Sequence, residues 1–180
     1  MFINLKSIRE IKLTVLNPLG SPARLNRMTR SSNVCADPIT ITLNGFQTQI
    51  SPEVEEVRVE MAGLKAERRQ VELVTSVGSC IAICLLDPIN KSGGLAHIML
   101  PDSTIFPRVS LPSKYADTAI PALIQAVQNL SAGKQNLRAK IAGGANMFPS
   151  IRATLNIGAK NVEAVKKALS KSRIHLIAED

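Results

Sequence analysis

Aromatic side chains are scarce in this sequence, whose 180 residues include no Trp, one Tyr and four Phe. The core must therefore be aliphatic, and the chain lacks the aromatic side chains with which proteins stack the bases of single-stranded nucleic acids. Long apolar runs are also absent, so no membrane span is predicted. The start, Met1–Lys6, has no uninterrupted apolar region before a small-residue cleavage site, and the cytoplasm is the expected location.

Cysteine and histidine are too few to form a disulfide framework or a zinc centre. The three cysteines, Cys35, Cys80 and Cys84, are irregularly spaced. The separation of Cys80 and Cys84 suits neither a redox CxxC pair nor the usual spacing of zinc ligands. Because His97 and His175 are the only histidines, we expect no metal and no cofactor.

The net charge of +8 is divided equally between two unequal parts of the chain. Residues 1–50 hold six Lys or Arg against two Asp or Glu, and the remaining 130 residues hold sixteen against twelve, so each part carries +4. The larger part is thus only mildly basic. This distribution, with the scarcity of aromatics, argues against nucleic-acid binding. A basic surface would instead attract an acidic partner.

The N-terminal part differs from the rest in its pattern. Asn17–Pro22 interrupts any regular element, and residues 24–32 are basic and polar. Ile39–Leu43 has the alternation typical of a strand. We predict that residues 1–54 form a basic, mostly mobile extension and that residues 55–180 form one folded domain.

Six strands are predicted within that domain. They cover residues 57–61, 71–74, 81–86, 95–100, 137–142 and 174–178. The charged stretch Lys65–Gln70 is predicted to be a connection. Because the strands do not alternate strictly with helices, the pattern favours an α+β fold over a doubly wound sheet.

Two amphipathic helices are predicted among these strands. The apolar face of the first consists of Ile120, Leu123, Ile124, Val127 and Leu130. Since Pro121 is tolerated only in a first turn, we place the N-cap at Asp117 or Thr118, and Ala132-Gly133 ends the helix. Asn161 is predicted to cap the second helix.

One thiol and one imidazole occupy corresponding places on two predicted strands. Cys80 lies where a small-residue turn meets the apolar run that starts at Ile81, and His97 lies inside the apolar run that follows Gly93-Gly94. A hairpin of these strands would bring Cys80 and His97 to the same end of the sheet. An imidazole that takes a thiol proton leaves a reactive thiolate, so the sequence predicts a Cys–His nucleophilic pair. Cys84 is predicted to be a core residue.

Glycine turns surround this pair in the sequence. The backbone N–H groups of Gly78 and Ser79 would hold the thiolate or the oxyanion of a tetrahedral intermediate. Gly94 would let a substrate approach closely. Gly143 and Gly144 form a tight turn that we expect to pack beside the active site and to supply a substrate contact.

Five segments of the sequence carry a family resemblance. They are Thr75–Cys80, Gly93–Asp102, Lys114–Pro121, Ala142–Met147 and Asn156–Val162. In this order they resemble the CheD family of chemoreceptor glutamine deamidases, over roughly residues 57–180. The resemblance implies a three-layer α/β/β sandwich with mixed sheets, as in some bacterial toxin deamidases.

The resemblance also implies a catalytic mechanism. Thr75 matches a threonine that orients the catalytic histidine in the family, although Ser76 is close enough to be confused with it. Asp102 is an alternative partner for His97. Cys80 would attack a glutamine carboxamide to form a thioester, and His97 would transfer the protons, which makes the protein a protein-glutamine glutaminase.

Chemoreceptors, the methyl-accepting chemotaxis proteins, are the implied substrates, and a CheC-type chemotaxis phosphatase is an implied partner. Contact with the membrane would then occur only through the receptors. Two alternatives stay open: a regulatory binding module for the phosphatase with little or no activity, and a cysteine protease or amidase with other substrates. The family normally continues beyond the last predicted strand, so the chain, which stops at Asp180, is expected to lack the family's C-terminal end.

Overall fold

The computed structural model describes residues 9–15, 39–43, 46–50, 54–105, 111–130, 136–146 and 156–180. Its strands are β1 (Arg9–Val15), β2 (Ile39–Leu43), β3 (Phe46–Ile50), β4 (Glu55–Arg58), β5 (Leu64–Glu67), β6 (Val71–Val77), β7 (Ile81–Asp87), β8 (Ser92–Ile98), β9 (Arg138–Gly143) and β10 (His175–Glu179). Its helices are α1 (Ala116–Asn129) and α2 (Ile157–Lys171), and two 3-10 turns cover Ser103–Ile105 and Pro112–Lys114.

A five-stranded mixed sheet with the order β10-β9-β7-β8-β5 forms the centre of the fold. β7 pairs antiparallel with both β8 and β9, whereas β10 runs parallel to β9 after the crossover through α2. β7 and β8 are thus the predicted hairpin. Every residue of β7 except Leu86 is buried. The continuous apolar sequence of β7 reflects this burial, since a strand that is covered on both faces needs no polar alternation.

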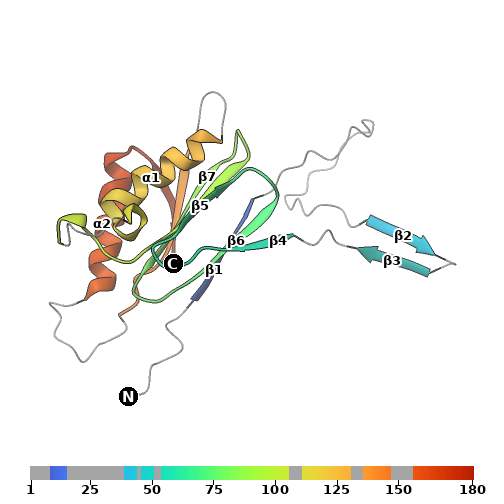
Figure 1. The fold of residues 1–180 in the computed structure, drawn as a ribbon, viewed down its shortest axis with the longest axis horizontal. Helices are drawn as coiled ribbons and strands as arrows, with labels where there is room; N and C mark the ends of the chain where they lie inside the picture. The colour runs from blue at the N-terminus through green and yellow to red at the C-terminus, as the bar shows by residue number, and fades with distance from the viewer. Residues whose placement is uncertain are drawn as a thin grey trace, which may run out of the picture.

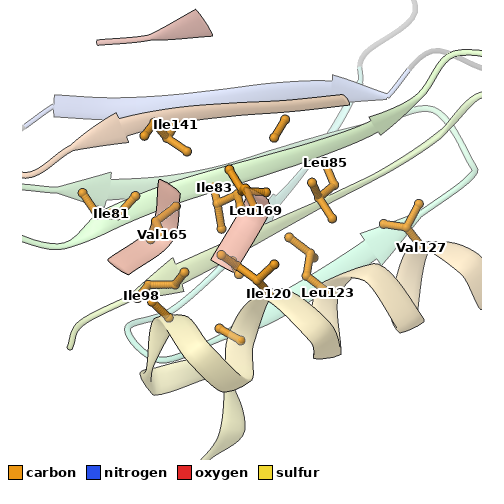
Figure 2. Packing of buried hydrophobic residues seen from close by; sticks show 14 residues of the cluster. Ile81, Ile83, Leu85, Ile98, Ile120, Leu123, Val127, Ile141, Val165 and Leu169 are labelled. Carbon is orange, nitrogen blue, oxygen red and sulfur yellow. The ribbon is translucent and has the colours of Figure 1, made fainter. Parts of the chain in front are cut away.

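Both helices cover one face of the central sheet (Figure 1). Aliphatic side chains from this face and from the helices form one cluster, shown in Figure 2. The cluster contains Ile81, Ile83, Leu85, Ala96, Ile98, Ala116, Ala119, Ile120, Leu123, Val127, Ala139, Ile141, Val165 and Leu169. Each large side chain that is buried here stabilises the fold by about 1.5–3 kcal/mol.

A second, three-stranded sheet with the order β1-β6-β4 packs on the other face of the central sheet (Figure 1). Its interior cluster joins residues of the three-stranded sheet, such as Leu73 and Val77, with Ala82, Cys84 and Leu95 of the central sheet. β4 runs parallel to β6 and β1 antiparallel to it. The molecule therefore has the predicted α+β fold, a three-layer α/β/β sandwich with mixed sheets.

Each of the six predicted strands has an observed counterpart, but the connection predicted at Lys65–Gln70 was wrong in part. Leu64–Glu67 is strand β5, which pairs antiparallel with β8 at the edge of the central sheet. Leu64 and Ala66 pack against the helix-side cluster. The alternating Lys65 and Glu67 hid this strand in the sequence, although charged residues are common on edge strands.

Part of the N-terminal extension also differs from the mobile segment that we predicted. Arg9–Val15 forms β1, which pairs with the whole of β6 from Val71 to Val77, and Leu13 is buried in the inter-sheet cluster. Ile39–Leu43 is a strand as predicted, and it forms a hairpin with Phe46–Ile50. The Asn17–Pro22 break and residues 24–32 lie outside the described residues.

Both predicted helix starts were wrong. α1 begins at Ala116, after the extended Tyr115, whose carbonyl accepts from Ala119 N at 2.7 Å. Pro121 therefore lies in the second turn. The carbonyl that Pro121 leaves without its helical donor belongs to the exposed Asp117, where water can replace the lost bond. The predicted end at Ala132-Gly133 lies outside the described residues.

α2 begins five residues before the predicted start. Its N-cap is Asn156, whose side chain accepts from Ala159 N at 3.1 Å. Asn161 lies inside the helix and is fully buried. In the described part of the chain, no helix is long and apolar enough to cross a membrane.

Candidate active site

Cys80 and His97 lie on the face of the central sheet that the second sheet covers. Cys80 immediately precedes β7, and His97 in β8 is paired with Ala82. Cys80 and Ala82 are two residues apart and share a face of the strand, so Cys80 is the diagonal neighbour of His97 across the strand pair. Cys80 is partly exposed, whereas His97 is only 3% exposed. The thiol and the imidazole thus lie on the same face of the sheet, as diagonal neighbours at the end of the β7–β8 pair.

The hydroxyl of Thr75 fixes the imidazole from the opposite sheet. Thr75 Oγ1 donates to the Val59 carbonyl at 2.8 Å and lies 2.8 Å from His97 Nδ1. Since the single hydroxyl proton goes to Val59, Thr75 Oγ1 must accept from Nδ1–H. Nδ1 is therefore the protonated nitrogen of neutral His97, and Nε2 keeps its lone pair. Nε2 is buried, and no described residue forms a hydrogen bond with it.

Burial keeps both members of the pair uncharged at neutral pH. Burial lowers the pKa of His97, and the nearby carboxylate of Glu60 opposes this shift in part. Burial also raises the pKa of the Cys80 thiol. The resting pair is therefore a thiol and a neutral imidazole rather than the thiolate that the sequence suggested. A neutral imidazole with a free lone pair on Nε2 is the form that a general base requires.

The turn that carries Cys80 is anchored through its carbonyl groups. Gly144 N donates to the Cys80 carbonyl at 3.0 Å, and Ala145 N donates to the Gly78 carbonyl at 2.9 Å. The carbonyl of Ser79 accepts a third bond at 3.0 Å from a side chain of α2. The N–H groups of Gly78, Ser79 and Cys80 donate to no other described residue. These groups are the available donors for an oxyanion at this turn.

The close approach of the two turns requires glycine at Gly143 and Gly144. Both have left-handed backbone angles, with φ of 110° and 77°. A Cβ atom at Gly143 would overlap the carbonyl oxygen of Cys80, and one at Gly144 would lie 2.5 Å from a methyl carbon of Val162. The two glycines thus let their turn pack against the turn that carries Cys80. Met147, the end of this motif, lies outside the described residues.

Gly94 does not belong to this site. It pairs with Leu85 and faces α1, where a Cβ atom would lie 2.7 Å from Leu123 Cδ1 and 2.9 Å from Val127 Cγ2. Because Gly94 and His97 are three residues apart on one strand, they face opposite sides of the sheet. The glycine permits close helix packing rather than substrate approach, so the proposed substrate contact was a misassignment.

The structure also distinguishes the other residues that the sequence raised as candidates for the site. Ser76 is exposed, so Thr75 and not Ser76 points into the inter-sheet layer. Asp102 accepts from Thr104 N at 2.8 Å, which lowers the pKa of its carboxyl group, and it makes no bond with His97. Cys84 is buried in the inter-sheet cluster, and burial raises the pKa of its thiol to about 12. His175 lies exposed on β10 at the far edge of the sheet.

Sequence reasoning missed two contributors to the site. Val59 supplies the carbonyl that orients the Thr75 hydroxyl, and no sequence signal marks a backbone acceptor. Asn161 supplies the side chain that binds the nucleophile turn. A polar residue three positions after Gly158 and four before Val165 falls on the buried helix face, so the spacing of these residues was a usable signal. Among the described residues, no cluster of three or more His, Cys, Asp or Glu side chains is suited to a metal ion.

Comparison with known proteins now places the chain. The family model described as "CheD chemotactic sensory transduction" matches residues 99–180. A Clostridium novyi protein is 47% identical over 129 residues, which cover 70% of this chain and 80% of the relative. A Clostridium botulinum (strain Eklund 17B) protein is 48% identical over 131 residues, 71% of this chain and 81% of the relative. Both are named "Probable chemoreceptor glutamine deamidase CheD". The chain belongs to the CheD family.

The similarity to the clostridial relatives covers the segment of the chain that carries Cys80 and His97. The family model begins at residue 99, after Cys80 and His97. A continuous match over 70% of a 180-residue chain, however, necessarily contains residues 75–97. The segments aligned with the two clostridial CheD relatives therefore include positions 75, 80 and 97.

Proposed function

We propose that this protein is a chemoreceptor glutamine deamidase that converts glutamine side chains to glutamate through a Cys80 thioester. One observation carries the proposal: Thr75 holds His97 with Nε2 unprotonated, on the sheet face and at the strand end where Cys80 lies. The names of the clostridial relatives supply the substrate class.

The first half of the proposed reaction forms the thioester. His97 Nε2 takes the Cys80 proton as Sγ attacks the carboxamide carbon of glutamine, and the carbonyl oxygen becomes an oxyanion near the N–H groups of Ser79 and Cys80. As the C–N bond breaks, Nε2–H gives its proton to the departing nitrogen, which leaves as ammonia. Nδ1–H stays bonded to Thr75 throughout, so the imidazolium forms in a fixed orientation.

The second half hydrolyses the thioester. Water gives a proton to His97 Nε2 as its oxygen attacks the acyl carbon, and the C–S bond then breaks. Cys80 leaves as a thiolate and recovers the proton from His97, which restores the resting pair. The carboxylic acid that forms loses the second proton of the water molecule to the solvent at neutral pH, so each turnover replaces an amide by a carboxylate and adds one negative charge to the receptor.

We further propose that a CheC-type phosphatase binds the protein and that membrane contact occurs only through receptors. A regulatory binding role with little or no activity is the alternative function. Cys80→Ala separates the two, because it removes the nucleophile from a partly exposed position and should leave phosphatase binding intact.

The decisive experiment is mass spectrometry of a purified chemoreceptor cytoplasmic fragment after incubation with wild type, Cys80→Ala or Cys84→Ala protein. We expect amide-to-acid conversion at specific glutamines with wild type and Cys84→Ala, and at least about 10⁴-fold slower conversion with Cys80→Ala. A folded wild-type protein that converts no glutamine would overturn the deamidase proposal, and phosphatase binding by that sample would then support the regulatory role. New peptide ends would instead indicate a protease.

A further inference from the structure

A buried side chain of α2 joins the two strand ends that carry Cys80 and His97. Asn161 is fully buried, and its Nδ2 donates to the carbonyl of Ser79 at 3.0 Å and to the carbonyl of Met99 at 2.9 Å. Ser79 immediately precedes Cys80, and Met99 follows His97 by two residues. One amide group is therefore bonded to both chain segments of the pair.

The chemistry of its partners fixes the orientation of this amide. Both neighbours are carbonyl oxygens, which only accept hydrogen bonds, so the atom between them must be the NH₂ group of Asn161. Its two protons are then both used. The other end of the amide, Oδ1, is buried without a hydrogen-bond partner among the described residues. A buried acceptor without a partner costs stability, which suggests that the bridge has a role beyond stabilising the helix.

The bridge lies where the ladder between β7 and β8 stops. Ile81 and Ile98 are its last paired residues, and the two chains continue separately on one side as Cys80 and Ser79, and on the other as Met99. Beyond the ladder no strand pairing fixes the separation of the segments. The Asn161 amide donates to a carbonyl group of each segment, so it joins the two segments beyond the last residue pair of the ladder.

Close packing of α2 allows Asn161 to reach these carbonyls. Gly158, one turn earlier on the same helix face, lies so close to the Gly144 carbonyl that a Cβ atom would overlap it. Val165, one turn later, is fully buried in the helix-side cluster. The helix backbone at Asn161 is thus held by packing on both sides, and the short Asn side chain reaches the two carbonyl groups from a fixed position.

We propose that Asn161 is a positioning residue that sets the distance and alignment between Cys80 Sγ and His97 Nε2. Its relevance to deamidation rests on the proposed function, but its effect on the thiol does not. Gly144 and Ala145 would still hold the Cys80 turn without the bridge, but no side chain would then join this turn to the end of β8. His97 would then take the thiol proton less efficiently, because a misplacement of about 1 Å is enough to reduce such a transfer substantially.

The test is a double-mutant cycle on the rate of Cys80 alkylation by iodoacetamide at neutral pH, with site-resolved mass spectrometry to separate Cys80 from Cys35 and Cys84. The variants are Asn161→Ala, His97→Gln and the combination. We expect Asn161→Ala to slow alkylation about 10-fold in wild type, through weaker assistance from His97. In the His97→Gln background it should change the rate less than about 2-fold, because the assisting base is already gone. Equal fold-changes in both backgrounds would overturn the proposal and indicate a general structural role.

Two further variants distinguish the loss of the bridge from a general loss of folding stability. Leu169→Ala removes buried volume from the same helix two turns beyond Asn161, away from the residues that hold the bridge, so it should lower the melting temperature and leave alkylation unchanged. Asn161→Asp keeps the shape of the side chain, and in its protonated form it retains one donor. If Asn161→Ala does not fold, Asn161→Asp takes its place in the cycle with the same expected loss of coupling.

Receptor deamidation provides an independent readout. Asn161→Ala should lower kcat about 10-fold or more and change KM less than about 2-fold, because the receptor surface is untouched. If wild type deamidates receptors but the alkylation cycle is additive, the positioning role fails while the proposed function stands. If the cycle shows coupling but no receptor glutamine reacts, the proposed function fails while the positioning role stands.

Discussion

The two faces of the central sheet differ in what they carry. On the face under the helices, aliphatic side chains form a single cluster with α1 and α2. The face under the second sheet carries Cys80, Cys84 and His97 and receives Thr75 from the facing layer. The helix side contributes buried apolar surface. The sheet side contributes the His97 imidazole, which β8 carries and Thr75 of the facing sheet orients. Stability and catalysis should therefore be separable by face.

Position along the sheet matters as much as the face. Cys80 and Cys84 share a strand face and lie four residues apart, yet Cys84 is buried among apolar side chains while Cys80 stays partly exposed at the strand end. Ala82 between them is paired with His97, and its small side chain leaves room for the imidazole. At the end of the inter-sheet layer, a side chain such as Cys80 is both accessible to solvent and held in place. In the middle of the layer, a side chain such as Cys84 is only buried.

The largest effect should come from removing the base on the catalytic face. His97→Gln removes the proton acceptor, so deamidation of a receptor fragment should fall about 10³-fold, within the usual range for a general base. The measurement is initial-rate mass spectrometry, with a thermal melt of the same sample. A loss of less than about 10-fold in a folded sample would contradict the assigned role of His97.

On the helix face the opposite outcome is expected. Leu123→Ala removes a fully buried side chain from the aliphatic cluster, so the free energy of unfolding should fall by about 3 kcal/mol. Because Leu123 lies on the far side of the sheet from Cys80, kcat of the folded enzyme should remain within about 2-fold of wild type. Denaturant unfolding and deamidation rates check both parts. A large fall in kcat would show that the two faces are coupled.

Thr75→Val should have an intermediate effect. Valine keeps the shape of threonine but offers no acceptor to His97 Nδ1–H, and the Val59 carbonyl also loses its donor. The imidazole would then populate the wrong tautomer and orientation, and kcat should fall about 10–10²-fold. Thr75→Ser keeps the hydroxyl and should restore most of the rate. If valine and serine behave alike, the hydroxyl does not orient the base.

The sequence predicted the α+β class and most of the strands, though not β1, β3 and β5, and the family resemblance implied the three layers. The catalytic roles of Cys80 and His97 stay predictions. Continuous apolar runs mark strands buried on both faces, and a thiol and an imidazole at matching turn positions are typical of a nucleophilic pair. The same continuity hides which face each residue takes, which is why Gly94 was misassigned: it shares its strand with His97 but faces α1. Period-two reasoning that counted from His97 would have placed it correctly.

Other features depend on tertiary contacts that no local pattern records. β1 is a strand because it pairs with β6, more than fifty residues away in the chain. Asn161 resembles a helix cap in sequence, since Asn is favoured there. In the fold, the true cap is Asn156, and Asn161 instead replaces the strand pairing that ends at Ile81 and Ile98.

The smallest effect is expected in the pH dependence of the free energy of unfolding, to which the buried imidazole of His97 contributes. Because burial lowers its pKa in the folded protein, the unfolded chain binds the proton more readily below its ordinary pKa of about 6.5. The contribution of His97 to stability is therefore complete above about pH 6.5 and declines as pH falls toward the folded-state pKa, with a slope of at most about 1.4 kcal/mol per pH unit. Denaturant unfolding between pH 7.5 and pH 5.5 should show this decline in wild type and a shallower one in His97→Gln, whereas Leu123→Ala should lower the whole curve without changing its slope. Parallel curves for wild type and His97→Gln would mean that the imidazole is not desolvated in the folded protein. The inter-sheet layer around His97 would then not differ in solvent access from its edge at Cys80.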